Sequence, residues 1–540
     1  MTSSSGCRRW CYCILALLFA SAAQADTPPS PTKLPDKLPL CGLTPSKLIP
    51  NLCVYQYRVS TSSKECQQYV DQGFGYFYSY VWMEAARSFE TATYHDPNCA
   101  LAHWCLSRAL DQMWRTTQAT TALKKANELL AHASYSEQQL ITARMQEKGL
   151  LPNVGDTEAR KKLAIQTIDK LLAIHSDDQE AWYARAQLAN GNAYFGGSAA
   201  GVPFYKALLQ INPLHPGANH ELVHFYEGFS RPALGWEASE KYIASSPGIP
   251  HSWHMQAHLA TRLGRWDKAT TDSVKAAELQ RAYHTAMSVK PADDHQFQHH
   301  LNILGLCLIH DGRFREAREL KKEFEGYGYK EPQTWFRLHL AERDYAAALK
   351  IADSFRKTDK VMASYLASLV YLSQKQLERA RPEVEVLEQA FAERRSDKTL
   401  ERRLLETRGM LLCQQDGATA GLALLQRNVK ATMNDYGHHA WGNGAYYMET
   451  WGLAALAAGK YDTAEEAFLE SLAHDTGSVR AALGMQTLCE RLGRTDEARK
   501  YEKMALKFWK NAEVQAFVAE KSAITAMGAG VSTASIGGGQ

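Results

Sequence analysis

The amino-acid sequence predicts an all-α solenoid, built from antiparallel helix pairs that stack one on the next. Small and aromatic residues recur with a period of about 34 residues, which is the length of a helix–turn–helix repeat unit. The 540 residues are 45% hydrophobic and 22% charged, so the chain can bury a large core and is not of the disordered or collagen-like class. After the first 25 residues, no segment approaches the roughly 20 apolar residues that a membrane-spanning helix needs.

The N-terminus has the pattern of a secretory signal peptide over residues 1–25. Arg8 and Arg9 precede an apolar run, CYCILALLFA, and Ala23-Gln24-Ala25 provides a small-residue cleavage site. The alternative, a membrane anchor, would need about twice this apolar length. We therefore expect a soluble mature chain that is exported to the periplasm or to the extracellular space.

The charge balance excludes a strongly basic nucleic-acid-binding protein. Lys and Arg number 61 against 58 Asp and Glu, and loss of the signal peptide removes two Arg and no acid. The mature chain is therefore nearly neutral, so we expect no nucleic-acid partner and no anionic-membrane footprint.

A Pro- and Cys-containing segment, residues 26–64, is predicted to be extended. An oxidising compartment permits disulfides. One or two bridges are expected near the N-terminus, for example among Cys41, Cys53 and Cys66 or between Cys99 and Cys105, with the connectivity left open. The cysteine spacings do not match a zinc-binding CxxC pair.

The repeat pattern is clearest over residues 66–99, where its small, aromatic and proline positions are Gly73, Tyr76, Ala85, Phe89, Ala92 and Pro97. Small residues let the two helices of a unit approach closely, aromatic residues fill the gap to the next unit, and proline ends the second helix. The turn glycine and the following helix alanine recur five residues apart at Gly264, Gly312, Gly459 and Gly493.

These spacings resemble the tetratricopeptide repeat (TPR) signature over residues 65–512, with room for ten to thirteen helix pairs. The resemblance implies a right-handed superhelix whose first helices line a concave groove, and it favours a scaffold that binds a protein or peptide there. Residues 513–540 are expected to form a C-terminal tail, largely disordered from about residue 528.

Histidines recur with the repeat. In the unit that contains Gly264, groove-facing positions fall on His251, His254 and His258. One period earlier, His220 and His224 occupy the positions equivalent to His254 and His258. Residues four apart share one face of a helix, so two successive helices present paired imidazoles to the groove.

This array of histidines predicts a binding site for a transition metal such as Zn, Cu or Fe. The alternative function is therefore that of a metal-binding protein or a metal-dependent enzyme. Glu227 continues the face of His224, and His299 occupies a groove position in the following unit. The simpler interpretation, in which groove histidines hydrogen-bond to neighbouring helices or to a bound peptide, stays open.

Residues 220–224 also satisfy the HExxH pattern, in which two histidines bind zinc and the glutamate is a general base. Glu221 is therefore a weak catalytic candidate. Zincin folds surround such a helix with a sheet that this chain lacks. The equivalent position one period later is Met255, so the repeated feature is the histidines and not the glutamate.

A narrower resemblance covers about 50 residues. HPGANHELVHFYE followed by PHSWHMQAH is similar to a group of bacterial His-containing TPR proteins with the pattern HPGxxHxxxHxxE and PHxxHMxxH. Glu221 replaces a usual tyrosine, and Gln256-Ala257 replaces a frequent Pro-Ser. These departures leave every candidate ligand in place, and the resemblance carries no activity of its own.

Overall fold

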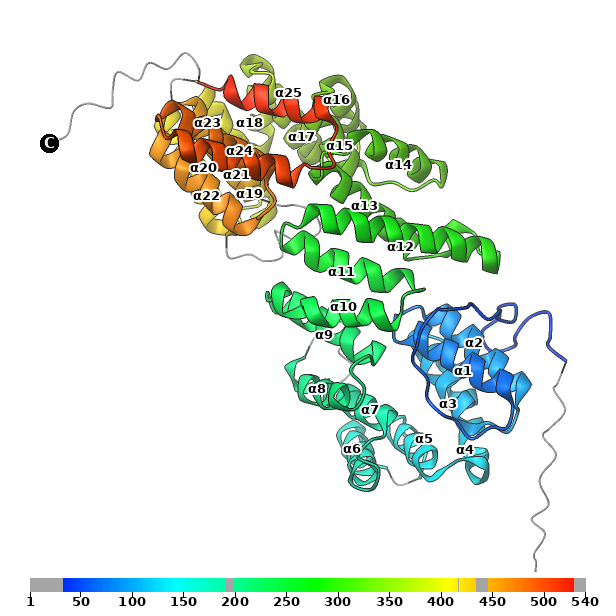
Figure 1. The fold of residues 1–540 in the computed structure, drawn as a ribbon. Helices are drawn as coiled ribbons and strands as arrows, with labels where there is room; N and C mark the ends of the chain where they lie inside the picture. Colours follow the sequence, from blue (N-terminus) through cyan, green and yellow to red (C-terminus); the bar gives the residue numbers. More distant parts are fainter. Residues whose placement is uncertain (1–32, 153, 191–197, 416, 434–444, 529–540) are drawn as a thin grey trace, which may run out of the picture.

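The computed structural model describes residues 33–152, 154–190, 198–415, 417–433 and 445–528 (Figure 1). These residues form 25 α-helices and no β-strand, which confirms the predicted all-α fold class. None of the described helices has the length and hydropathy to cross a membrane. The predicted signal peptide and the tail beyond residue 528 lie outside the described residues.

The first 24 helices form twelve successive antiparallel pairs. The pairs are α1 (Lys64–Phe77) with α2 (Trp82–His95), α3 (Ala100–Gln112) with α4 (Thr116–Glu128), α5 (Tyr135–Glu147) with α6 (Thr157–Ile174), α7 (Gln179–Asn190) with α8 (Val202–Ile211), α9 (Pro216–Gly228) with α10 (Trp236–Ser245), α11 (Pro250–Arg262) with α12 (Trp266–Met287), α13 (Phe297–His310) with α14 (Phe314–Gly326), α15 (Pro332–Ala341) with α16 (Tyr345–Ser354), α17 (Lys360–Ser373) with α18 (Leu377–Glu393), α19 (Lys398–Gln414) with α20 (Ala418–Thr432), α21 (Tyr446–Ala457) with α22 (Tyr461–His474), and α23 (Val479–Arg491) with α24 (Thr495–Phe508).

The small residues of the repeat allow the paired helices to approach closely. A Cβ placed on Gly73 of α1 would lie 2.4 Å from the ring of Phe89 on α2. The same relation holds between Gly452 and Phe468 in the pair α21–α22. Because such a distance is far below van der Waals contact, glycine is required where the aromatic ring of the second helix packs.

The N-terminal segment packs against the first helices. The carboxylate of Glu90 accepts hydrogen bonds from the backbone N–H groups of Leu40 and Cys41, both at 2.7 Å. Arg115 donates to the carbonyl oxygens of the same two residues. The segment therefore follows α2 and α4 without forming a helix of its own.

The predicted disulfides are not formed. All eight described cysteines are free thiols, and most of them are buried. Thiols of this kind behave as small apolar residues in the core. The packing of the N-terminal segment therefore depends on hydrogen bonds and apolar contacts.

The first helix pairs curl back onto the middle of the solenoid (Figure 1). The backbone N–H of Val54 donates to the carbonyl of Ser245 at 2.8 Å, and the hydroxyl of Tyr283 on α12 donates to Glu84 on α2 at 2.6 Å. This curl brings the loop between α1 and α2 against α9, which determines the surroundings of the histidines. At the other end, α25 (Val514–Thr525) packs against α23.

Candidate metal centre

Seven histidines converge from the first helices of three successive pairs. His220 and His224 lie on α9, His251, His254 and His258 on α11, and His299 and His300 on α13. Both α9 and α11 begin with proline at the first helical position, where its fixed φ favours helix initiation. Because residues four apart share a helix face, each helix directs its imidazoles towards its neighbours.

The imidazoles form two adjacent groups. The first histidine group is His220, His224 and His251, and the second histidine group is His254, His258 and His299. Within each group, one ring nitrogen of every histidine lies within 4.8 Å of the others. The groups are adjacent because His251 and His254 are neighbours on α11, with ring centroids 5.7 Å apart.

One of the two closest nitrogen pairs has nearly the spacing of two ligands around one ion, and the other pair is shorter. The Nε2 atoms of His220 and His251 are 3.1 Å apart, and those of His254 and His258 are 2.7 Å apart. Zn–N bonds of about 2.0–2.1 Å in a tetrahedral site place two nitrogens about 3.3 Å apart. Each pair also satisfies the geometry of a hydrogen bond if one Nε2 carries a proton, as in the metal-free protein.

The outer nitrogens of three imidazoles are held by protein acceptors. The Nδ1 of His220 donates to the carbonyl of Tyr78 at 2.6 Å, and that of His258 donates to Glu227 at 3.4 Å. His300 donates from Nδ1 to Gln280 Oε1 at 2.5 Å. A proton on Nδ1 leaves Nε2 with its lone pair in the neutral ring, which is the tautomer that a metal ligand requires.

Burial keeps five imidazoles of the two histidine groups neutral. Burial first, and then the charge of neighbouring histidines, hold the pKa values of His220, His251 and His254 well below the usual histidine value. The same causes lower the pKa values of His224 and His299 to about 4, and Glu227 moderates both shifts. These five histidines therefore present uncharged nitrogen donors at neutral pH.

Glu227 lies behind the ligand set and not within it. One carboxylate oxygen accepts from Arg262 at 3.0 Å, and the other accepts from His258. Although burial opposes ionisation, His258 and Arg262 lower the pKa of Glu227 to about 2. The structure thus brings together six of the seven predicted metal ligands and makes Glu227 a residue that orients His258.

The carboxylate of Glu221 is likewise separate from the converging nitrogens. Its Oε1 accepts hydrogen bonds from the hydroxyls of Tyr80 at 2.8 Å and Tyr183 at 3.3 Å. The ring of Tyr80 in turn stacks on His224, with centroids 5.6 Å apart. Glu221 therefore positions an aromatic wall of the first histidine group, and this arrangement does not resemble that of the HExxH general base.

Two parts of the centre were missed by sequence reasoning. Tyr78 and Tyr80 come from the loop between α1 and α2, about 140 residues before the histidines they contact, and no repeat spacing indicates them. His300 was also missed, although its position beside His299 was a visible signal. Its ring lies 4.0 Å from that of His254, and its Nε2 is buried with no hydrogen-bond partner among the described residues.

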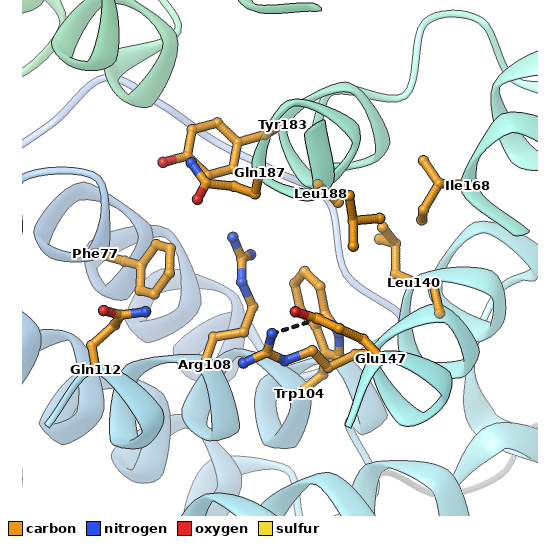
Figure 2. Close-up of a pocket in the computed structure, with 13 residues that line it drawn as sticks. Phe77, Trp104, Arg108, Gln112, Leu140, Glu147, Ile168, Tyr183, Gln187 and Leu188 are labelled. Atoms are coloured by element: carbon orange, nitrogen blue, oxygen red, sulfur yellow. Dashed lines mark hydrogen bonds and ion pairs between the residues drawn. The ribbon is translucent and has the colours of Figure 1, made fainter. Parts of the chain in front are cut away.

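A separate small cavity of about 60 Å³ lies among α3, α5 and α7. Figure 2 shows Arg108 reaching into it beside Phe77 and Trp104. Arg108 is 4.4 Å from the centroid of each ring and forms an ion pair with buried Glu180 at 3.1 Å. The space fits a few water molecules, and its charged groups are paired, so it is a structural feature of the core.

The fold and the repeated helix pairs define an all-α repeat protein of the helix–turn–helix solenoid type. More specifically, residues 450–513 match the family model of the tetratricopeptide repeat, and the preceding pairs share this architecture. No curated protein matches the chain at a significant level.

Solved structures of other repeat proteins cover most of this chain and of their own chains, but their sequence identities and TM-scores are low. An IFIT1 monomeric mutant with Gppp-AAAA is 14% identical, with 84% of this chain and 92% of that chain covered and a TM-score of 0.28. The P58(IPK) TPR domain is 11% identical, with 82% and 99% covered and a TM-score of 0.26. The APC/C hetero-tetramer Cut9–Hcn1 is 12% identical, with 85% and 90% covered and a TM-score of 0.31. At these TM-scores, no property of a site is transferred to this chain.

Proposed function

We propose that this protein binds two transition-metal ions in the groove of its solenoid, one in each histidine group. The observation that supports this most directly is the pairing of Nε2 atoms at 3.1 and 2.7 Å, with the Nδ1 atoms of His220 and His258 held from behind. A set of isolated groove histidines would have no reason to share this orientation. The proposal favours the alternative function of the sequence analysis over a groove that binds only a peptide.

The donor set selects the class of metal. Six imidazole nitrogens, without a converging carboxylate or thiolate, suit Zn, Cu, Fe or Ni and disfavour Mg and Ca. Three protein donors per ion leave one position for water or another ligand. This is the arrangement of catalytic zinc sites, whereas structural sites have four protein ligands.

Metal analysis of tag-free protein tests the proposal. After chelation and reconstitution with Zn²⁺, Cu²⁺ or Fe²⁺, we expect two equivalents of one metal per chain. His220→Ala should remove the ion of the first histidine group, and His258→Ala the ion of the second. The exposed His132, far from both groups, provides the control His132→Ala. Absence of bound metal, or equal retention by all three variants, would refute the proposal.

We also propose that a protein partner binds the solenoid, because TPR-type scaffolds serve protein–protein interaction. Trp114 at the α3–α4 turn is 91% exposed, and tryptophan is enriched among residues that dominate binding energy. A photo-cross-linker at position 114 should capture a partner, whereas one at the exposed Ile174 should not. Equal capture at the two positions, or none at either, would count against this surface.

Export remains a proposal that rests on residues 1–25. N-terminal sequencing of the protein from fractionated cells should give Asp26 as the first residue. An intact Met1 in the cytoplasmic fraction would contradict it.

A further inference from the structure

The C-terminal half of the solenoid encloses a second and larger cavity, of about 470 Å³. The first helices of its pairs, α13, α15, α17, α19, α21 and α23, line the cavity together with α25. Its volume lies in the range of pockets that bind small organic molecules. We call it the C-terminal cavity, and its apolar lining includes Phe314, Leu340, Leu369, Met410, Leu453 and Val479.

The helix α25 borders one side of this space. Glu520 on α25 accepts from Arg480 Nε at 2.8 Å and from Arg343 at 2.5 Å. These two arginines come from α23 and from the turn between α15 and α16. The three side chains join distant parts of the solenoid across the cavity, which favours a small ligand over a folded segment of a partner.

The carboxylates that line the cavity already have partners. Glu406 accepts from the hydroxyls of Tyr365 at 2.8 Å and Thr450 at 3.2 Å. Glu449 accepts from Ser478 at 2.6 Å. Together with Glu520, these are the acids among the described lining residues. None of them therefore needs a cationic ligand.

Arg337 differs from the other two arginines that line the C-terminal cavity, Arg343 and Arg480, which both pair with Glu520. Its guanidinium lies 3.8 Å from the ring centroid of Tyr446, yet within the described residues it has no hydrogen-bond acceptor and no carboxylate within 4.0 Å. The hydroxyl of Tyr446 is 3.0 Å from His310 Nε2, which fixes the ring that supports Arg337. Glu406 attracts this guanidinium electrostatically but does not contact it. The N–H groups of Arg337 therefore stay available to an anion in the cavity.

We propose that the C-terminal cavity binds a small organic carboxylate with an apolar body, and that Arg337 pairs with the carboxylate. A carboxylate matches the two-pronged geometry of one guanidinium. The apolar side chains around it accommodate the hydrocarbon part, whose burial provides most of the affinity. This site is independent of the proposed metal ions, because none of the histidines in the two groups lines the cavity.

Isothermal titration calorimetry of the full chain with decanoate tests this proposal, with decanol and decyl phosphate as matched probes. We expect one decanoate per chain, bound at least tenfold more tightly than decanol and no more weakly than decyl phosphate. Equal affinity for decanoate and decanol would show that charge is not recognised. A tenfold preference for decyl phosphate would overturn the assignment to a carboxylate.

Variants then test the residues. Arg337→Gln should weaken decanoate binding at least tenfold and leave decanol binding unchanged. The control is Arg379→Gln, because Arg379 lies over Tyr371 in the same manner, 4.4 Å from its centroid, but outside the cavity. Ala454→Phe fills the cavity while Arg337 is retained, and should abolish binding of both probes. Wild-type affinity in either cavity variant, or no decanoate binding up to millimolar concentration, would overturn the proposal.

Discussion

Lowering the pH from 7.0 to 5.5 is expected to destabilise the histidine centre of the metal-free protein. Five histidines of this region, at most 8% exposed, are involved: His215, His220, His251, His254 and His300. Burial is the first cause of their depressed pKa values, which are about 3 for His215 and His300 and well below 6.5 for the other three. All five therefore stay neutral in the folded state at pH 5.5.

The magnitude follows from the protons that only the unfolded chain binds. A histidine with a depressed folded pKa contributes stability above its unfolded pKa of about 6.5, and this stability is lost as the pH falls. One pH unit below 6.5, the loss is about 1.4 kcal/mol per group, or about 7 kcal/mol for five. A typical domain has a total stability of only about 5–15 kcal/mol.

Glu227 and Asp294, two acids close to the histidines, do not obscure this effect. His258 and Arg262 outweigh the opposing effect of burial and keep the pKa of Glu227 at about 2, and His284 and Gln280 likewise lower that of Asp294. Both acids remain ionised between pH 7.0 and 5.5. Burial raises the pKa values of Asp272 on α12 to about 6 and of Asp311 at the end of α13 to about 7. These two acids take up protons in the same window and stabilise their own surroundings as the pH falls, so the comparison is restricted to α9 and α11.

The suitable assay is hydrogen exchange measured by mass spectrometry. Long repeat arrays unfold in parts, so a single global unfolding transition would average the stabilities of different helix pairs. After correction for the intrinsic pH dependence of exchange, amides of α9 and α11 should lose several kcal/mol of opening free energy at pH 5.5. Those of α23, which contains no histidine, serve as the control. A loss under about 2 kcal/mol in α9 and α11, or an equal loss in α23, would refute buried neutral histidines.

Three further predictions concern single side chains. Glu227→Gln should weaken metal binding by the second histidine group about 10–100-fold and spare the first, as a competitive chelator titration would show, because His258 loses its orienting charge. Gly452→Ala should lower the melting temperature, since its Cβ would lie 2.5 Å from a ring atom, whereas Gly326→Ala, with no atom within 4 Å, should not. Arg108→Met should cost about 3–5 kcal/mol in urea unfolding by leaving Glu180 buried without its ion pair, and a cost under about 1 kcal/mol would contradict that role.

Much of the architecture was predictable because its determinants are local. Gly73 and Phe89 lie 16 residues apart in one repeat, and their spacing reports a contact within a single helix pair. The histidines on α9 and α11 were predictable for the same reason, since a 34-residue period maps equivalent positions onto one face of the solenoid. The disulfides were predicted incorrectly, because cysteine counts and compartment do not specify which thiols approach each other.

The roles of the acidic residues near the histidines could not be predicted from their spacing. Glu227 follows the face of His224, but the guanidinium of Arg262, one helix away, engages its carboxylate. Glu221 fits a sequence pattern for catalysis, but Tyr80 and Tyr183 engage it instead. A carboxylate side chain turns towards the nearest donor, and the repeat period does not reveal which donor that is.

The sequence by itself determined that this protein is a solenoid of helix pairs and that its histidines recur on the first helices of successive pairs, because both follow from the repeat period. Only the tertiary structure decided that the loop carrying Tyr78 and Tyr80 packs against the first histidine group, and that α25 borders the C-terminal cavity. These contacts join segments that are far apart in the chain. The segments meet because many helix pairs stack with a cumulative curvature. No local pattern encodes that curvature.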